Sequence, residues 1–311
     1  MILVAGSANL DFVVRAAHIP GPGETVLGRG FKTYPGGKGA NQAVASARAG
    51  AATTHMLLAL GDDAYSAPLQ ASLRSAGVHM HLVRVPSEAT GTAFICVSDD
   101  AENAITVAPG ANNALRAEHL PPLALYSHLL MQLETPLATV AAYAAAARAA
   151  GVRVVLNAAP AQPLAPALLA SIDLLVVNEG ELAAIAGHQH SVAQCLQAVP
   201  VPTIVVTLGS RGCCARQGSS YLVQPAFAVT PVDTTGAGDT FCGALVAALD
   251  SGDDLAAAMR LASAAGALAC TVAGAQSSIP DQTQVRDFLA RNGDPPGHAA
   301  LRRYCGLPAP T

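Results

Sequence analysis

Short apolar runs alternate with longer segments of helical periodicity along most of this 311-residue chain. The runs have the length of single strands, and the segments between them are long enough to cross back over a sheet. This alternation predicts an α/β fold, a three-layer α/β/α sandwich whose central sheet is mainly parallel. We expect strands at 2–5, 54–59, 128–131, 152–156, 174–177 and 203–207, and helices at 40–49, 65–76, 137–149, 179–186 and 237–249.

Two stretches interrupt the alternation. Residues 11–35 and 92–108 carry strand-forming residues between turn residues and have no helical period. They predict a small separate β-sheet, placed to cover a cleft as a lid. We expect residues 1–291 to form a single domain. Residues 292–311, which are rich in Pro and Gly, are expected to be a loosely ordered tail.

Composition narrows the class of protein. Hydrophobic residues make up 51% of the chain, yet no apolar run is long enough to span a membrane. The net charge of −4, with scattered basic residues, gives no nucleic-acid footprint. Seven cysteines without a CxxC pair, in a chain without an export signal, indicate reduced thiols and a cytoplasmic location. The His-x-His pairs at 79/81 and 188/190 lack accompanying carboxylates or cysteines, so we do not expect a metal there.

The segment 232–243 contains the strongest chemical signal. Gly236, Ala237 and Gly238 stand where an apolar-periodic helix begins, and Asp239 follows in its first turn. The free N–H groups and positive dipole end of a helix bind anions, and residues without bulky side chains allow close approach. A carboxylate beside such a pocket can take a proton from a hydroxyl during phosphoryl transfer. The alternative is an ordinary helix start in which the aspartate serves as a cap.

A second glycine cluster, Pro35-Gly36-Gly37-Lys38-Gly39-Ala40-Asn41, also opens a helix. It has neither the spacing of a Walker A loop nor that of a dinucleotide fingerprint, which argues against an NAD-linked oxidoreductase. Gly37 would expose backbone N–H groups, while Lys38 and Asn41 would offer donors and an acceptor suited to a polyol. A plain helix start is the alternative.

Polar residues also end several predicted strands, where ligands bind in parallel sheets. Asn9 and Asp11 follow the first strand on one side of the chain, and Glu134 follows the strand at 128–131. Asn178 and Glu181 can hold Mg²⁺ or cap a helix. The turn from Thr207 to Gly209 can wrap a phosphate or simply reverse the chain.

Together these segments resemble the ribokinase family of sugar kinases, also called PfkB carbohydrate kinases. The resemblance spans about residues 1–290 and is most specific at Gly-Gly-Lys-Gly-Ala-Asn-Gln-Ala and Asp-Thr-Thr-Gly-Ala-Gly-Asp-Thr-Phe. Met-Gln-Leu-Glu at 131–134 and Gly-Ala-Gln-Ser-Ser-Ile-Pro at 274–280 favour the members that phosphorylate D-ribose. The resemblance implies ATP-dependent transfer to the sugar 5-hydroxyl, with Mg²⁺, activation by K⁺, and a homodimer formed through the lid sheet.

The family also implies a role for individual residues. Asp239 would be the base, and Gly236, Ala237 and Gly238 the anion hole. The sugar would be held by Asn9, Asp11, Gly37, Lys38, Asn41 and Glu134. Asn178, Glu181, Thr207 and Gly209, with Gly238, would face the nucleotide and Mg²⁺. The K⁺ ion would lie among Asp233, Thr235, Ala269, Val272, Gly274 and Ser278.

The chain departs from the family at one turn, where Ser66 replaces the last glycine of Gly61-Asp62-Asp63-Ala64-Tyr65-Ser66. This departure affects the expected turn and not the residues expected to carry out the reaction. Two alternative functions stay open. One is another kinase of the family, acting on deoxyribose, fructose or a nucleoside. The other is a sugar-binding regulator that has lost catalysis, against which the intact Asp239 argues.

Overall fold

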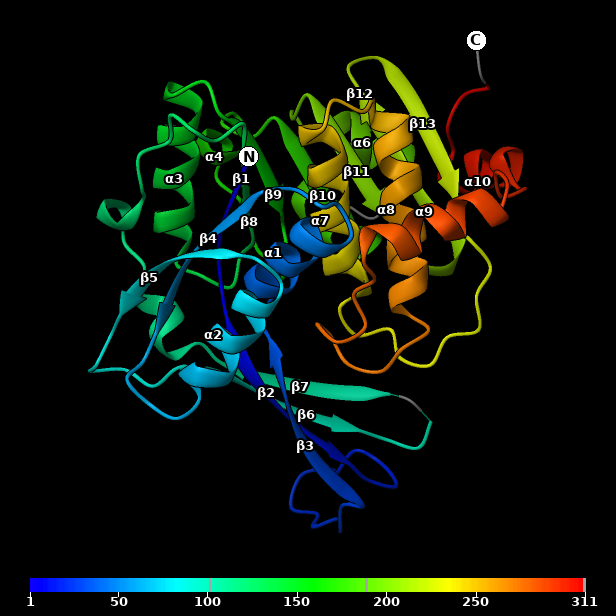
Figure 1. The fold of residues 1–311 in the computed structure, drawn as a ribbon. Helices are drawn as coiled ribbons and strands as arrows, with labels where there is room; N and C mark the ends of the chain where they lie inside the picture. The colour runs from blue at the N-terminus through cyan, green and yellow to red at the C-terminus, as the bar shows by residue number, and fades with distance from the viewer. Residues whose placement is uncertain (101, 188–189, 310–311) are drawn as a thin grey trace.

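A computed structural model describes residues 1–100, 102–187 and 190–309 of the protein. Nine strands form the central sheet, in the order β13-β12-β11-β10-β9-β8-β1-β4-β5 (Figure 1). Its strands are β1 (Ile2–Ala5), β4 (Thr54–Leu60), β5 (His79–Arg84), β8 (His128–Met131), β9 (Arg153–Asn157), β10 (Leu174–Asn178), β11 (Thr203–Thr207), β12 (Gly212–Gln217) and β13 (Ser220–Pro225).

Neighbouring strands from β5 through β11 in this order pair in parallel, whereas β12 pairs antiparallel with both β11 and β13. The predicted mainly parallel sheet is therefore confirmed. Because the parallel strands share one direction, their carboxyl ends meet at one edge, where ligands bind in sheets of this kind. The antiparallel hairpin that extends the sheet at one side was not predicted.

Helices cover both faces of the sheet, and each face has its own apolar cluster (Figure 1). One face packs against α1 (Lys38–Arg48), α2 (Ser66–Ser75), α7 (Ala237–Asp250), α8 (Leu255–Ala269) and α9 (Gln282–Arg291). The other packs against α3 (Leu137–Ala149), α4 (Pro166–Leu169), α5 (Glu179–Ala186), α6 (Val192–Ala198) and α10 (His298–Cys305). Three short 3₁₀ turns are η1 (Gly110–Ala114), η2 (Ala117–His119) and η3 (Gly209–Arg211).

Helices α1 and α7 approach each other unusually closely. A Cβ atom at Gly243 would lie 2.4 Å from the carbonyl oxygen of Gln42, and one at Gly50 would lie 2.0 Å from the Cβ of Ala247. Only glycine leaves room for this contact between backbones. The close crossing brings the first turn of α1 beside the first turn of α7.

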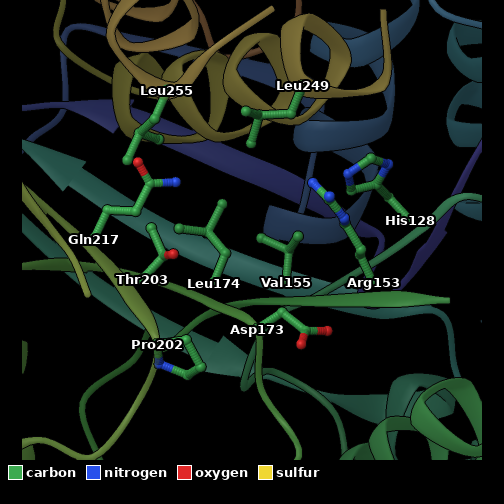
Figure 2. A pocket seen from close by; sticks show the side chains of 10 residues that line it. All are labelled: His128, Arg153, Val155, Asp173, Leu174, Pro202, Thr203, Gln217, Leu249 and Leu255. Atoms are coloured by element: carbon green, nitrogen blue, oxygen red, sulfur yellow. The ribbon is translucent and has the colours of Figure 1, made fainter. Parts of the chain in front are cut away.

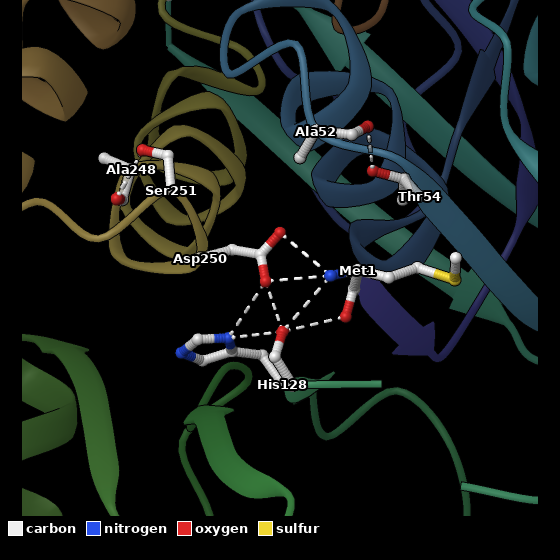
Figure 3. Close-up of polar contacts among 8 residues, drawn as sticks. Met1, Ala52, Thr54, His128, Ala248, Asp250 and Ser251 are labelled. Carbon is white, nitrogen blue, oxygen red and sulfur yellow. Dashed lines mark hydrogen bonds and ion pairs between the residues drawn. The ribbon is translucent and has the colours of Figure 1, made fainter. Parts of the chain in front are cut away.

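The far end of α7 is tied to the start of the chain. The Met1 ammonium group donates to the Asp250 carboxylate at 2.9 Å, and Ser127 Oγ donates to the Met1 carbonyl at 2.9 Å (Figure 3). Asp250 is the last residue of α7. The helix is therefore held at the amino edge of the sheet, while its first turn lies at the carboxyl edge.

The predicted small sheet is present as four strands in the order β3-β2-β6-β7. They are β2 (Asn9–Arg15), β3 (Gly30–Gly36), β6 (Gly91–Val97) and β7 (Asn103–Ala108). Phe12 stacks between Phe31 and Phe94 on this sheet, at centroid distances of 6.0 and 5.3 Å. Strand β2 follows β1 after three residues, so the small sheet grows directly out of the centre of the large one.

The C-terminal segment departs from the expected loosely ordered tail. Residues His298–Cys305 form α10, and Leu301 and Cys305 are buried in the apolar cluster of its face. The Pro and Gly residues that suggested disorder flank this short amphipathic helix instead. Among the described residues, no helix is long and apolar enough to cross a membrane. The seven cysteines are free thiols.

Candidate active site

Asp239 lies buried in the first turn of α7, and two amides from α1 hold its carboxylate. Asn41 Nδ2 donates to Oδ2 and Gln42 Nε2 donates to Oδ1, each at 2.9 Å. Gly236 precedes the helix with φ at 75°, and a Cβ there would meet Ala275 at 3.1 Å. The carboxylate is thus fixed in orientation, and each of its oxygens retains a lone pair for another donor.

Further amides support this pair, and sequence reasoning missed them. Gln42 Nε2 also bonds Asn157 Oδ1 at 2.9 Å, and Gln132 Nε2 donates to Gln42 Oε1 at 2.6 Å. Gln276 Nε2 donates to Asn41 Oδ1 at 3.1 Å. Gln42 and Gln132 are fully buried, and a buried amide is costly without such partners. The one signal in the sequence was polar residues within otherwise apolar segments.

The predicted sugar-side residues converge at the start of α1. Glu134 Oε2 accepts hydrogen bonds from Ser7 Oγ at 2.6 Å and from the Lys38 N–H at 3.1 Å. Asp11 is buried against Gly36, where a Cβ would lie 2.0 Å from Asp11 Oδ2. Asn9 is buried as well, and its Oδ1 accepts from Asn112 Nδ2 at 2.8 Å, a partner that the sequence did not indicate.

The charges of the site act on one another. Burial, with the nearby charges of Glu134 and Asp239, raises the pKa of Asp11 to about 7. The charge of Asp239 raises the pKa of Lys38 above its usual range despite burial, and Glu134 and Glu181 add to the effect. Lys38 is therefore a cation held by three carboxylates, those of Asp239, Glu134 and Glu181, and such a mixture of charges suits a polar ligand beside an anionic one.

Asn178 and Glu181 form a reciprocal cap at the start of α5. Asn178 Oδ1 accepts from the Glu181 N–H, and Glu181 Oε2 accepts from the Asn178 N–H, both at 2.8 Å. Burial raises the pKa of Glu181. The structure thus has the capping arrangement that was the alternative to a ligand role, although Glu181 Oε1 stays outside the cap. Thr207 ends β11, and the exposed Gly209 begins η3 beside it.

Two loops meet behind the start of α7. Asp233 Oδ1 accepts from the Thr235 N–H and Oδ2 from the Gly274 N–H, each at 2.9 Å. Burial acts to raise the pKa of Asp233, but these hydrogen bonds outweigh it and hold the pKa below its usual value. The carbonyl of Ala269 accepts from the Val272 N–H at 3.3 Å. Ser278 Oγ donates to the Ala275 carbonyl at 3.0 Å, so five of the predicted cation residues lie on these two adjoining loops, and Ala269 ends α8 just before the second loop.

A cleft of about 570 Å³ separates the small sheet from these loops. Asp11 and Tyr34 line it from β2 and β3, and Asp233, Thr235 and Gly274 line it from the opposite side. A second cavity of about 280 Å³ lies at the amino edge of the large sheet, among His128, Arg153, Leu174 and their neighbours (Figure 2). It contains none of the predicted site residues.

His79 and His81 of the first predicted pair pack with His55 and Tyr126. His81 Nε2 lies 3.2 Å from His55 Nδ1 and 2.9 Å from the Tyr126 hydroxyl, in a hydrogen-bonded group. Within residues 1–100, 102–187 and 190–309, no three His, Cys, Asp or Glu side chains are arranged to hold a metal. His188 of the other pair lies outside the described residues.

The sequence matches the profile of the pfkB family carbohydrate kinases over residues 1–282. The chain belongs to the pfkB family. Ribokinases of Haemophilus influenzae and Bacillus subtilis are 39% and 37% identical to it over 93% of this chain, and over 98% and 99% of their own lengths. The solved structure of Arabidopsis thaliana ribokinase complexed with ribose and ATP is 34% identical, with a TM-score of 0.84. That match covers 93% of this chain and 98% of the other.

Membership of the pfkB family makes the chain a carbohydrate kinase, a phosphotransferase with an alcohol as acceptor. The fold agrees with this assignment, since a large mainly parallel sheet and a separate small sheet are both present. The family does not by itself assign a task to each polar side chain of the site.

Proposed function

We propose that this pfkB kinase transfers the terminal phosphoryl group of ATP to the 5-hydroxyl of D-ribose, giving ribose 5-phosphate and ADP. The ribokinases among its relatives support this substrate. The observation that carries the proposal is the start of α7. There, a buried Asp239 held by two amides lies next to Gly238, where an added Cβ would have no atom within 4 Å.

Asp239 is proposed to accept the hydroxyl proton as the bond to phosphorus forms. The amides of Asn41 and Gln42 orient its carboxylate without taking up all of its lone pairs. The helix dipole favours the carboxylate and so makes it a weak base, which suits late proton transfer in a loose transition state. Positioning and charge stabilisation then supply most of the acceleration.

The transferred phosphoryl group is proposed to bind at the backbone N–H groups of Gly238 and Asp239. These groups have no hydrogen-bond partner within the described residues, and they lie at the positive end of α7. Gly236 and Ala237 shape the turn, since the φ of 75° at Gly236 favours glycine. Lys38, whose cation interacts with both Asp239 and Glu181, would draw in the phosphates from the side of α1.

The sugar is proposed to lie between β2 and the start of α1, where Asp11 and Glu134 supply acceptors. Asn9, Gly37 and Asn41 complete this group. Asn41 gives one donor to Asp239 and accepts from Gln276, so its amide orientation is fixed. The small sheet, which faces the cleft, would act as the lid of the single domain spanning residues 1–291.

The nucleotide is proposed to lie along the turns after β10 and β11, with Thr207 and Gly209 beside it. Asn178 Oδ1 and Glu181 Oε2 already accept hydrogen bonds in the helix cap. We therefore expect Mg²⁺ to be held near them indirectly, through water molecules and phosphate oxygens. When bound, Mg²⁺ would neutralise the phosphate charge. Glu181 Oε1 is the acceptor that remains for a metal-bound water.

The loops around Asp233 are proposed to hold K⁺. The ion would be coordinated by carbonyl and carboxylate oxygens, a donor type that suits hard cations. The low pKa of Asp233 keeps a negative charge beside the start of α7. The proposed set is the predicted one: Asp233, Thr235, Ala269, Val272, Gly274 and Ser278.

We further infer a homodimer formed through the small sheet. Phe31, Phe94 and Ile105 are each more than half exposed on it, which is unusual for a group of large apolar side chains. A second copy of the sheet would bury them. The proposed location is the cytoplasm, which supplies ATP and keeps the seven thiols reduced.

A panel of acceptors tests the function. ADP formation would be measured with ATP, Mg²⁺ and K⁺ and, in turn, D-ribose, 2-deoxyribose, fructose and adenosine. We expect the highest kcat/KM with D-ribose. A higher value with deoxyribose, fructose or adenosine would assign the enzyme to another specificity of the pfkB family. Sugar binding without ADP formation on any acceptor would instead favour the non-catalytic regulator.

A further inference from the structure

The C-terminal helix α10 lies beyond the residues 1–282 that match the family profile. It packs beside β13, at one end of the large sheet (Figure 1). Leu301 and Cys305 join the apolar cluster that also contains Leu182 of α5 and Leu208 of the turn after β11. Helix α10 therefore shares one apolar cluster with the two segments that carry the proposed nucleotide-binding residues.

Tyr304 of α10 contacts both of the turns concerned. Its hydroxyl donates to Glu179 Oε1 at 2.8 Å, and the Arg211 guanidinium lies 4.2 Å from the centre of its ring. Glu179 follows Asn178 directly at the start of α5, and Arg211 is the last residue of η3, which begins at Gly209. One side chain thus connects the turn after β10 with the turn after β11.

We propose that Tyr304 is a positioning residue for the nucleotide, which it serves by fixing these two turns relative to each other. This inference rests on the proposed function. The hydrogen bond holds the Glu179 carboxylate toward α10, away from a triphosphate that its charge would repel. The ring holds Arg211 and with it the turn whose Gly209 N–H faces the nucleotide. Tyr304 itself touches neither the sugar nor the phosphoryl group.

Two substitutions separate the contacts. Tyr304→Phe keeps the ring under Arg211 and removes the hydrogen bond to Glu179, while Tyr304→Ala removes both. Tyr221→Phe is the matched control, because Tyr221 lies on β13 beside α10 but its hydroxyl accepts from Gln197 Nε2 at 3.2 Å. Within the part of the chain that the structure describes, it makes no hydrogen bond or ring contact with either turn. Each variant would be assayed for KM of ATP, KM of ribose, kcat, melting temperature and ADP binding by calorimetry.

We expect Tyr304→Ala to raise both the KM for ATP and the Kd for ADP about five- to tenfold, as for loss of an exposed cation–π contact and a hydrogen bond to a charged group. Tyr304→Phe should raise them about two- to threefold. The KM for ribose and kcat at saturating ATP should stay at wild-type values in both variants. The Tyr221→Phe control should match the wild type in every measurement.

An unchanged ADP Kd in Tyr304→Ala would overturn the inference. An equal rise in both KM values together with a lower melting temperature would also overturn it, since that result describes a structural role only. Combining Tyr304→Ala with Arg211→Gln should give less than the product of the single effects, because the two side chains act through one contact. The ADP measurement needs no sugar, so it tests Tyr304 even if the wild type phosphorylates no acceptor and the proposed function fails.

Discussion

The two glycine-rich helix starts of this protein look alike in sequence but differ in what surrounds them. At α1, other groups of the protein accept hydrogen bonds from the N–H groups of the first turn. The Lys38 N–H donates to Glu134, the Gly39 N–H to Ser7 Oγ, and the Ala40 N–H to the Ser7 carbonyl. At α7, the N–H groups of Gly238 and Asp239 have no partner within the described part of the chain.

The space around the glycines differs in the same way. A Cβ at Gly39 would lie 2.6 Å from the Ser7 nitrogen, and one at Gly37 would lie 2.7 Å from the Asn9 nitrogen. A Cβ at Gly238 would meet no atom within 4 Å. At α1, glycine therefore allows neighbouring backbone to pack closely. At α7, it leaves open space through which a ligand can approach the end of the helix. Only the second helix start presents free donors to an anion, while the first contributes side chains.

The largest expected effect concerns the carboxylate at the open helix start. Asp239→Asn should lower kcat by at least about a hundredfold, because the amide cannot accept the hydroxyl proton. Steady-state assays with ribose and ATP would measure it. The KM for ribose should change little, since the sugar-side groups belong to α1, β2 and the turn after β8.

Calorimetry of ribose binding and a melting curve control for misfolding of this variant. The amide places an N–H opposite the donors Asn41 and Gln42, so we expect a lower melting temperature with retained sugar binding. A folded Asp239→Asn protein with near-normal turnover would show that Asp239 is not the base. The open helix start would then be only an anion site.

The sequence predicted both helix starts but not the difference between them. The alternation of strands and helices gave the parallel sheet, and its strand ends gave Asn9, Asp11, Glu134 and Asn178. Nothing in the spacing distinguished a filled helix start from an open one. That difference depends on Ser7 and Glu134, which reach α1 from other strands.

The amide network around Asp239 was missed for a related reason. Gln42, Asn157, Gln132 and Gln276 come from α1, β9, the turn after β8 and the loop before α9. Each is a single polar residue within its own segment, and only the tertiary fold brings them together. The helix α10 escaped prediction because its amphipathic pattern is only two turns long and is flanked by Pro and Gly.

One substitution made at both helix starts tests the comparison directly. Gly39→Ala should destabilise the protein by about 1–3 kcal/mol, because the new methyl group would overlap the Ser7 backbone. Gly238→Ala should leave the free energy of unfolding within about 1 kcal/mol of the wild type, since alanine favours the helix. Its kcat/KM should fall about ten- to a hundredfold, because the methyl group enters the proposed phosphoryl site.

Urea unfolding and steady-state kinetics on both variants would give the two readouts. The comparison requires opposite outcomes, with stability lost at α1 and activity lost at α7. A Gly238→Ala enzyme of normal activity would place the phosphoryl group elsewhere. A Gly39→Ala protein of normal stability would show that the packing at α1 relaxes easily.

A smaller effect is expected from the loops behind α7. Adding K⁺ to enzyme prepared in a K⁺-free buffer should raise activity several-fold, because the proposed ion would stabilise the turn that presents Gly238 and Asp239. Asp233→Asn removes the charge while keeping an acceptor, so it should flatten the K⁺ titration without abolishing turnover. A flat titration in the wild type would contradict the cation site.

The smallest expected effect is a pH dependence on the side of α1. The raised pKa of Asp11, about 7, means that the folded protein favours the neutral carboxyl, so this group's contribution to stability is lost as pH rises from about 4 to about 7. The melting temperature should therefore change less with pH across this range in Asp11→Asn than in the wild type. Ionised Asp11 accepts sugar hydroxyls better, so the wild-type KM for ribose should fall between pH 6 and pH 8 by an amount that Asp11→Asn lacks. Identical pH profiles of the two proteins would mean that Asp11 does not titrate in this range. Ionisation of Asp11 would then not change ribose binding beside the start of α1.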